Sequence, residues 1–167
     1  RIPAPVQSGW IAEDDTVTYN GPAENFSRYM FGEDDWTDCV IEVTMDIEEG
    51  REAGIVLHFQ DIRNYYKVVL NEQQKTVSLI RVLDGTETVL DTLGADYIQD
   101  RNRIYIDFYQ DEIAVFINGM SAILMQDDAL YRGKAGFFAA QTPAVTFTDS
   151  SVDYKTVKDT VLGHLTD

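Results

Sequence analysis

The chain has 167 residues, a length that suits one domain with a sizeable hydrophobic core and disfavours two. Its 13 basic and 29 acidic residues give a formal net charge of -16 at pH 7, so long-range repulsion disfavours nucleic acid and anionic membranes as partners. No apolar run approaches the roughly 18 residues of a membrane span, and a single cysteine excludes an internal disulfide. Neutral, cationic or metal-bridged partners are therefore favoured.

The beginning of the chain is rich in proline and predicts a linker over residues 1–9, so we expect a module of a longer protein. The first strand is expected over residues 10–19, followed by a turn at Asn20-Gly21-Pro22 and a second apolar stretch over residues 26–31. Further strands are expected over residues 38–47, 53–60, 65–71, 76–83, 86–92, 103–110, 112–118, 121–125, 133–140 and 145–154.

The strand expected over residues 38–47 shows the clearest alternation of apolar and polar side chains. Cys39 has the parity of the core residues, which predicts an inert buried thiol, whereas Glu42 has the opposite parity. Asp84-Gly85 and Asn118-Gly119 each predict a tight two-residue hairpin. Short strands at this spacing predict an all-β fold, a two-sheet antiparallel β-sandwich of jelly-roll type over residues 10–154.

The tail over residues 155–167 is expected to be a short helix or the beginning of a linker. Its apolar residues recur at helical spacing. They are Val157, Val161, Leu162 and Leu165.

A series of motifs along the chain resembles the concanavalin A-like lectin/glucanase superfamily, and more narrowly its laminin-G-like and family 66 carbohydrate-binding branch. The series runs through Trp36-Thr37-Asp38, AGIVLHFQD, RNYYKVVL, VSLIRVLDGTETVL, IYIDFYQDEIAVFINGM, GKAGFFAA and VTFTDSSVDY. The resemblance covers residues 10–154. It implies two stacked antiparallel sheets, one of them concave, with sugars bound on or beside the concave face.

The resemblance implies that Glu42 corresponds to a glutamate found on a strand of the family. It also implies that His58 stands at a position where many relatives have arginine. Tyr65 and Tyr66 match a pair of aromatic residues, although the parity of Tyr66 makes it a core residue. In neighbouring strands, the alternate side chains that face away from the core include both aromatic rings and polar groups, and a sugar-binding site requires both. We expect the carbohydrate-binding residues to project from one sheet surface: Glu42, His58, Gln60, Tyr65, Lys67, Tyr105, Asp107 and Tyr109.

Acidic loops suggest a calcium site, because Ca²⁺ takes several oxygen ligands from flexible loops. Related sandwiches often hold a structural calcium near the chain ends or the sheet rim. Glu13, Asp15 and Asp153 are the candidate ligands, and none of the acidic clusters has the spacing of an EF-hand. Zinc is disfavoured, because His164 is the only histidine besides His58.

Catalysis is the less favoured interpretation. Glu42 and Asp107 are candidates for a glycosidase pair, which in retaining enzymes needs carboxyl groups about 5–5.5 Å apart. The E-x-D-x-x-E signature of glucanases in this superfamily is absent, as are a nucleophile elbow and a phosphate loop. We therefore expect a non-catalytic module, with a laminin-G-like protein-interaction or structural domain as the alternative and a glycoside hydrolase as the lesser one.

The resemblance also predicts the partner and the location. The expected role is to attach a larger bacterial protein, outside the cell or at its surface, to a polysaccharide or oligosaccharide through the concave face. A terminal fructose of a fructan or another chain end is a candidate ligand. Polymers that contain arabinose or galactose fit the same residues equally well.

Overall fold

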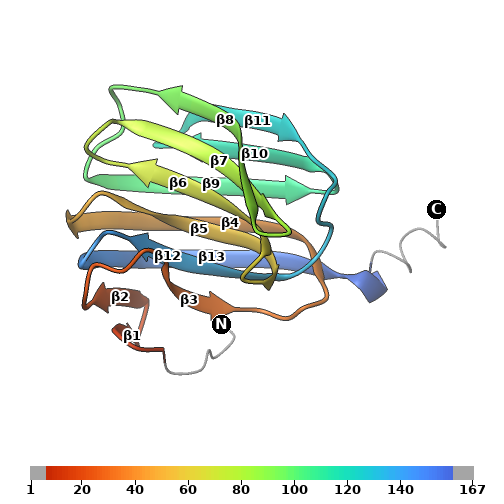
Figure 1. Cartoon of the computed structure of the whole chain (residues 1–167), viewed down its shortest axis with the longest axis horizontal. Coiled ribbons are helices and arrows are strands. Elements are labelled where there is room, and N and C mark those ends of the chain that lie inside the picture. Colours follow the sequence, from red (N-terminus) through yellow and green to blue (C-terminus); the bar gives the residue numbers. More distant parts are fainter. Residues whose placement is uncertain (1–6, 160–167) are drawn as a thin grey trace.

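Strands with alternating burial form two antiparallel sheets in the computed structural model, which describes residues 7–159 (Figure 1). The larger sheet, sheet A, has seven strands in the order β1-β2-β13-β4-β9-β10-β11. Its strands are β1 (Trp10–Glu13), β2 (Thr16–Asn20), β13 (Ala144–Thr156), β4 (Trp36–Glu49), β9 (Arg101–Tyr109), β10 (Glu112–Ile117) and β11 (Met120–Gln126).

The smaller sheet, sheet B, has six strands in the order β3-β12-β5-β6-β7-β8. Its strands are β3 (Ser27–Phe31), β12 (Lys134–Ala140), β5 (Glu52–Asp61), β6 (Asn64–Asn71), β7 (Thr76–Leu83) and β8 (Thr86–Gly94). Figure 1 shows the two sheets stacked as layers, and their inner faces enclose one large apolar core. The predicted all-β sandwich is therefore confirmed.

Two of the turns follow directly from their residue types. Asp84 and Gly85 have φ angles of 50° and 80°, and Asn118 and Gly119 have 54° and 80°. Positive φ at both central residues defines the hairpin turn that matches the twist of paired strands, and Asp-Gly and Asn-Gly adopt it readily. Both predicted hairpins are present, between β7 and β8 and between β10 and β11.

The strand expected over residues 10–19 is in fact two strands. Asp14, at a φ of 52°, turns the chain so that β1 pairs antiparallel with β2. At the expected linker, the backbone N–H of Trp10 donates to the carbonyl oxygen of Gln7 over 3.0 Å, so residues 7–9 form part of the folded domain.

The last strand ends in a short helix, as the sequence predicts. Strand β13 continues to Thr156, and residues 157–159 are helical. Thr156 and Asp159 form a reciprocal cap, since the Thr156 backbone N–H donates to the Asp159 carboxylate (3.0 Å) and the Asp159 N–H to the Thr156 hydroxyl (3.3 Å). Three of the apolar residues expected on this helix lie outside the described residues: Val161, Leu162 and Leu165. No helix within residues 7–159 has the length and apolar character needed to cross a membrane.

Candidate functional site

A cavity of about 410 Å³ opens between the two sheets at one side of the sandwich, and we call it the lateral cavity. Strands β2, β4 and β13 of sheet A contribute to its lining together with β3 and β12 of sheet B and the turn between β1 and β2. Its lining residues are Asp14, Asp15, Val17, Tyr29, Phe31, Trp36, Phe137, Ser150, Ser151, Val152 and Tyr154.

Aromatic rings form the apolar part of the lateral cavity. Tyr154 stacks on Trp36 with ring centroids 4.1 Å apart and an interplanar angle of 13°. Phe31 meets the edge of Trp36 at 6.3 Å. Trp36 is buried, whereas Tyr154 is 46% exposed, so the tyrosine ring is held in place on one face and open to a ligand elsewhere.

Hydroxyl and carboxylate groups form the polar part of the same cavity. Asp14 and Asp15 come from the turn between β1 and β2, and Ser150 and Ser151 come from an irregularity in β13 where the register to β4 shifts. Asp149, at a φ of 53°, begins this irregularity, and its backbone N–H donates to the carbonyl oxygen of Asp15 over 3.2 Å. The backbone therefore ties the two polar segments to each other.

The outer face of sheet A carries a second, shallower hollow of about 350 Å³, lined by Glu42, Arg103, Tyr105, Phe116 and Gly119. Arg103 forms an ion pair with Glu42, in which the Arg103 Nε donates to the Glu42 carboxylate over 2.9 Å. Its Nη1 donates to the Thr44 hydroxyl over 3.0 Å. The predicted neighbours Glu42 and Tyr105 do lie opposite each other in the sheet, but the carboxylate is already engaged by an internal cation.

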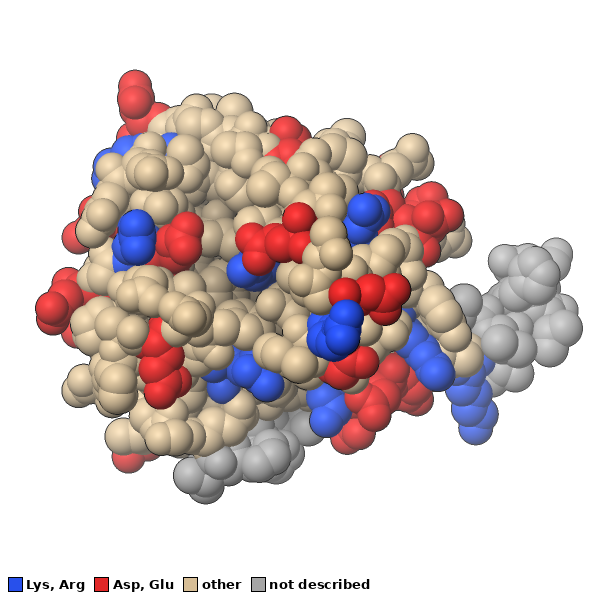
Figure 2. Space-filling view, viewed as in Figure 1, with Lys and Arg blue, Asp and Glu red and all other residues tan. Residues whose placement is uncertain are grey.

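The outer face of sheet B carries a satellite apolar cluster that includes Val56, Tyr65 and Phe138. Phe26, which precedes β3, stacks on Tyr65 at 5.2 Å between centroids. Burial and then the nearby Glu87 raise the pKa of Tyr65, so its phenol stays neutral. Figure 2 shows this face hollowed over its middle strands, with Lys and Arg side chains (blue) as well as Asp and Glu side chains (red) around the hollow.

The structure splits the carbohydrate-binding residues expected on one surface between two faces of the molecule. Strands β4 and β9 belong to sheet A, so they carry Glu42, Tyr105, Asp107 and Tyr109 on its outer face. Strand β6 belongs to sheet B and carries Tyr65 and Lys67 on the opposite face of the sandwich. The expectation of a single surface is therefore wrong, because alternation identifies a side chain that faces away from the core without identifying its sheet.

Two further predicted residues lie elsewhere. Gln60 is exposed near the end of β5, where its amide donates to the carbonyl oxygen of Arg132 over 3.1 Å. His58 is buried against Phe108, with ring centroids 3.9 Å apart. Its φ of 46° marks an irregularity in β5 that turns the side chain toward the core, so the predicted surface position of His58 is wrong.

The candidate calcium ligands do not form a cluster. Glu13 ends β1, Asp15 lies in the following turn and Asp153 lies on β13. Within residues 7–159 no group of three or more His, Cys, Asp or Glu side chains is placed to hold a metal ion. These three carboxylates are therefore not a ligand set by themselves, and calcium binding stays a prediction.

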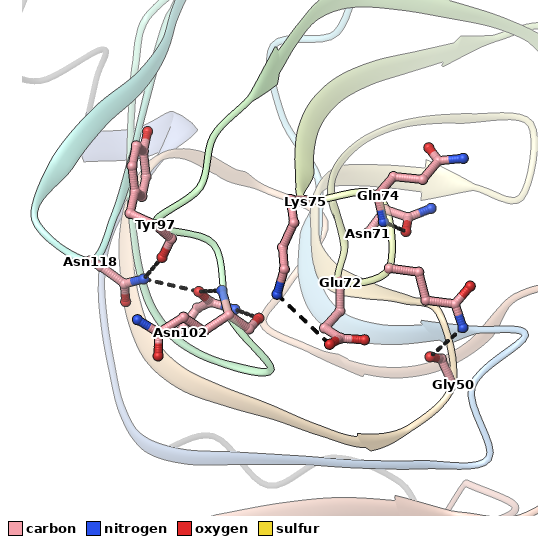
Figure 3. A network of polar contacts seen from close by, with 10 residues as sticks. Gly50, Asn71, Glu72, Gln74, Lys75, Tyr97, Asn102 and Asn118 are labelled. Atoms are coloured by element: carbon pink, nitrogen blue, oxygen red, sulfur yellow. Dashed lines mark hydrogen bonds and ion pairs between the residues drawn. The ribbon is translucent and has the colours of Figure 1, made fainter.

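Polar networks fix the loops at one end of the sandwich (Figure 3). The Asn118 amide donates to the carbonyl oxygen of Tyr97 (3.0 Å) and to the side chain of Asn102 (2.9 Å). At the turn between β6 and β7, Lys75 pairs with Glu72 at 3.9 Å. These groups satisfy one another, which favours a structural role for this end of the molecule.

Sequence reasoning missed most of the lateral cavity. It placed Trp36 before the strand expected over residues 38–47 and Tyr154 at the end of the domain, and it did not consider Ser150 or Ser151 as site residues. The one available signal was the polar run from Thr148 to Ser151, which interrupts the alternation of the last strand.

Comparison with known proteins finds no matching family model and no matching curated protein. Among solved structures, the carbohydrate-binding module CBM66 from Bacillus subtilis superposes with a TM-score of 0.74 at 14% identity, over 86% of this chain and 90% of that one. A putative glycosyl hydrolase from Parabacteroides distasonis gives a TM-score of 0.63 at 13% identity, over 87% and 83% of the two chains. The galectin LEC-6 from Caenorhabditis elegans gives 0.59 at 10% identity, over 81% and 95%.

These superpositions demonstrate a shared fold. The fold implied by the resemblance to the concanavalin A-like superfamily and its family 66 branch is confirmed. The chain has the β-sandwich fold of a carbohydrate-binding module and of galectins.

Proposed function

We propose that this chain is a non-catalytic carbohydrate-binding module that attaches the protein to a polysaccharide outside the cell, and that the lateral cavity is its sugar site. The observation that carries the proposal is the combination, in one cavity, of an open aromatic ring, two carboxylates and two hydroxyls. A volume of about 410 Å³ lies within the range typical of small-molecule sites, roughly 300–1,000 Å³.

Each component of the cavity matches one part of a sugar. The CH-rich face of a sugar ring packs against an aromatic ring, and Tyr154 presents such a ring, held by Trp36. The carboxylates of Asp14 and Asp15 accept hydrogen bonds from sugar hydroxyls, and such charge-assisted bonds are the stronger kind. Ser150 and Ser151 can donate as well as accept.

The position of the cavity favours the end or a side branch of a polymer. A cavity that opens at one side of the sandwich, between two sheets, admits a terminal sugar more easily than an internal segment of a chain. The proposed role is adsorption, which keeps an attached domain close to its polymer and raises the effective concentration. The β-sandwich fold shared with the CBM66 module from Bacillus subtilis supports the same role.

A binding screen with matched variants tests the proposal. The protein is incubated with insoluble polysaccharides and a glycan array that includes fructans, arabinans and galactans, with and without a calcium chelator. Tyr154→Ala and Asp15→Asn are expected to weaken retention. Tyr131→Ala is the control, because Tyr131 is similarly exposed, at 62%, and lies outside the cavity lining.

The outcomes separate the candidate sites. Loss of binding in Tyr105→Ala with full binding in Tyr154→Ala would place the site on sheet A, as the sequence predicts, and overturn the lateral cavity. No retention on any plant, fungal or bacterial glycan would contradict the carbohydrate function and favour the protein-interaction alternative. Loss of binding with chelator alone would support the predicted calcium.

A further inference from the structure

The outer face of sheet B lacks the strong excess of acidic residues that the whole chain has. Arg28 on β3, Lys67 on β6 and Lys134 on β12 lie on it, against Glu52 on β5 and Glu87 on β8. The whole chain has 29 acidic and 13 basic residues, whereas this face carries three basic residues against two acidic ones. The repulsion that disfavours an anionic ligand elsewhere on the chain is therefore weakest at this face.

Arg28 lies against two aromatic rings. Its guanidinium carbon lies 5.4 Å from the ring centroid of Phe26 and 5.3 Å from that of Phe59. It makes no ion pair with any carboxylate in the part of the chain that the structure describes. The two rings hold the guanidinium in place, and a guanidinium in this state presents a planar fork that binds a carboxylate through two hydrogen bonds.

Lys67 lies beside the same ring. Its ammonium nitrogen is 5.6 Å from the centroid of Phe26 and 5.9 Å from that of Phe138. Its ion pair with Glu87 is long, at 3.7 Å, and the lysine side chain is 15% exposed while the glutamate is 56% exposed. A lysine needed only for solubility would extend into water, whereas this one lies against two aromatic rings.

We infer that the hollow on the outer face of sheet B is a second binding site, independent of the lateral cavity, for a sugar that carries a carboxylate. Arg28 binds the carboxylate through its fork, and Lys67, which lies beside the same Phe26 ring, supplies a second positive charge. Phe26 and the apolar side chains around it contact the CH groups of the sugar ring. The ligand class is a uronic acid or a chain of uronic acids.

The test compares oligogalacturonate with the same oligosaccharide fully methyl-esterified, by titration calorimetry at fixed ionic strength of about 150 mM, where exposed charges act over only about 8 Å. The acid form is expected to bind about tenfold more tightly than the ester, because esterification removes the charge-assisted bonds. Equal affinity for the two forms, or no binding of the acid form, would overturn the inference.

Matched variants locate the site. Arg28→Gln is expected to weaken binding of the acid form about tenfold, and Arg28→Lys less, because lysine keeps the charge and loses the fork. Arg101→Gln is the control, since Arg101 is a more exposed arginine on sheet A. Thermal unfolding shows that each variant folds. Full affinity in Arg28→Gln, or an equal loss in Arg101→Gln, would refute the assignment.

Binding to the lateral cavity is measured separately with Tyr154→Ala. This variant is expected to bind oligogalacturonate normally. A loss of oligogalacturonate binding in Tyr154→Ala, with no effect of Arg28→Gln, would show that there is one site and that it is the cavity.

Discussion

Asp127 joins the two sheets, and its replacement by asparagine is expected to destabilise the protein strongly. Asp127 follows β11 of sheet A, and its carboxylate accepts hydrogen bonds from two residues of sheet B, the Tyr66 hydroxyl and Arg81 Nη1, the latter at 2.5 Å. The backbone N–H of Ala129 also donates to it, over 3.2 Å. The Asp127→Asn substitution keeps the shape of the side chain and removes its charge.

The magnitude follows from what Asp127→Asn leaves unpaired. A hydrogen bond to a charged group contributes about 1.5–3 kcal/mol, and the new amide would present a donor to Arg81, which itself only donates. The Arg81 side chain is largely buried, and its Nε has no hydrogen-bond partner among the described residues. We expect a loss of about 2–4 kcal/mol, below the upper end for fully buried pairs because Arg81 keeps some contact with water.

Urea or guanidinium unfolding at neutral pH measures this loss. A decrease of that size is a large part of the roughly 5–15 kcal/mol that stabilises a typical domain, so the midpoint shifts clearly. Asp128→Asn is the control, because Asp128 is the exposed neighbour in the same loop. Equal midpoints for the two variants would refute the assignment of Asp127 as the connection between the sheets.

Two further predictions concern buried titratable groups. Burial lowers the pKa of His58 below its ordinary 6.5, although the carbonyl oxygens of Leu130 and Thr37 oppose the shift. The unfolded chain therefore binds a proton that the folded chain resists, so the free energy of unfolding should fall as pH is lowered from about 7.5 to about 5.5. His58→Gln should flatten this slope in urea titrations, and an unchanged slope would contradict the prediction. Burial, followed by the charges of Asp38 and Asp107, raises the pKa of Cys39 to about 12. A thiol reagent should thus modify Cys39 only in denaturant, and rapid modification of the native protein would show that the thiol is accessible.

The sequence by itself determined most of the strands and their inward faces. In β4, every second residue from Cys39 to Ile47 is buried, as the alternation predicts. The two hairpins could also be predicted, because Asp-Gly and Asn-Gly favour positive φ through their own backbone preferences. Such features depend on neighbours in the chain, and therefore they can be recognised without knowledge of the fold.

Only the tertiary structure decided which side chains meet. Glu42 and Tyr65 both face away from the core, yet they lie on opposite faces of the sandwich, because strand pairing joins β4 to β9 and β6 to β5 and β7. His58 changes its side through a single residue at positive φ, which no alternation can indicate. The lateral cavity likewise brings Trp36 beside Tyr154, residues far apart in the sequence. Such contacts depend on pairing between distant strands, and a local pattern carries no information about which distant strand is the partner.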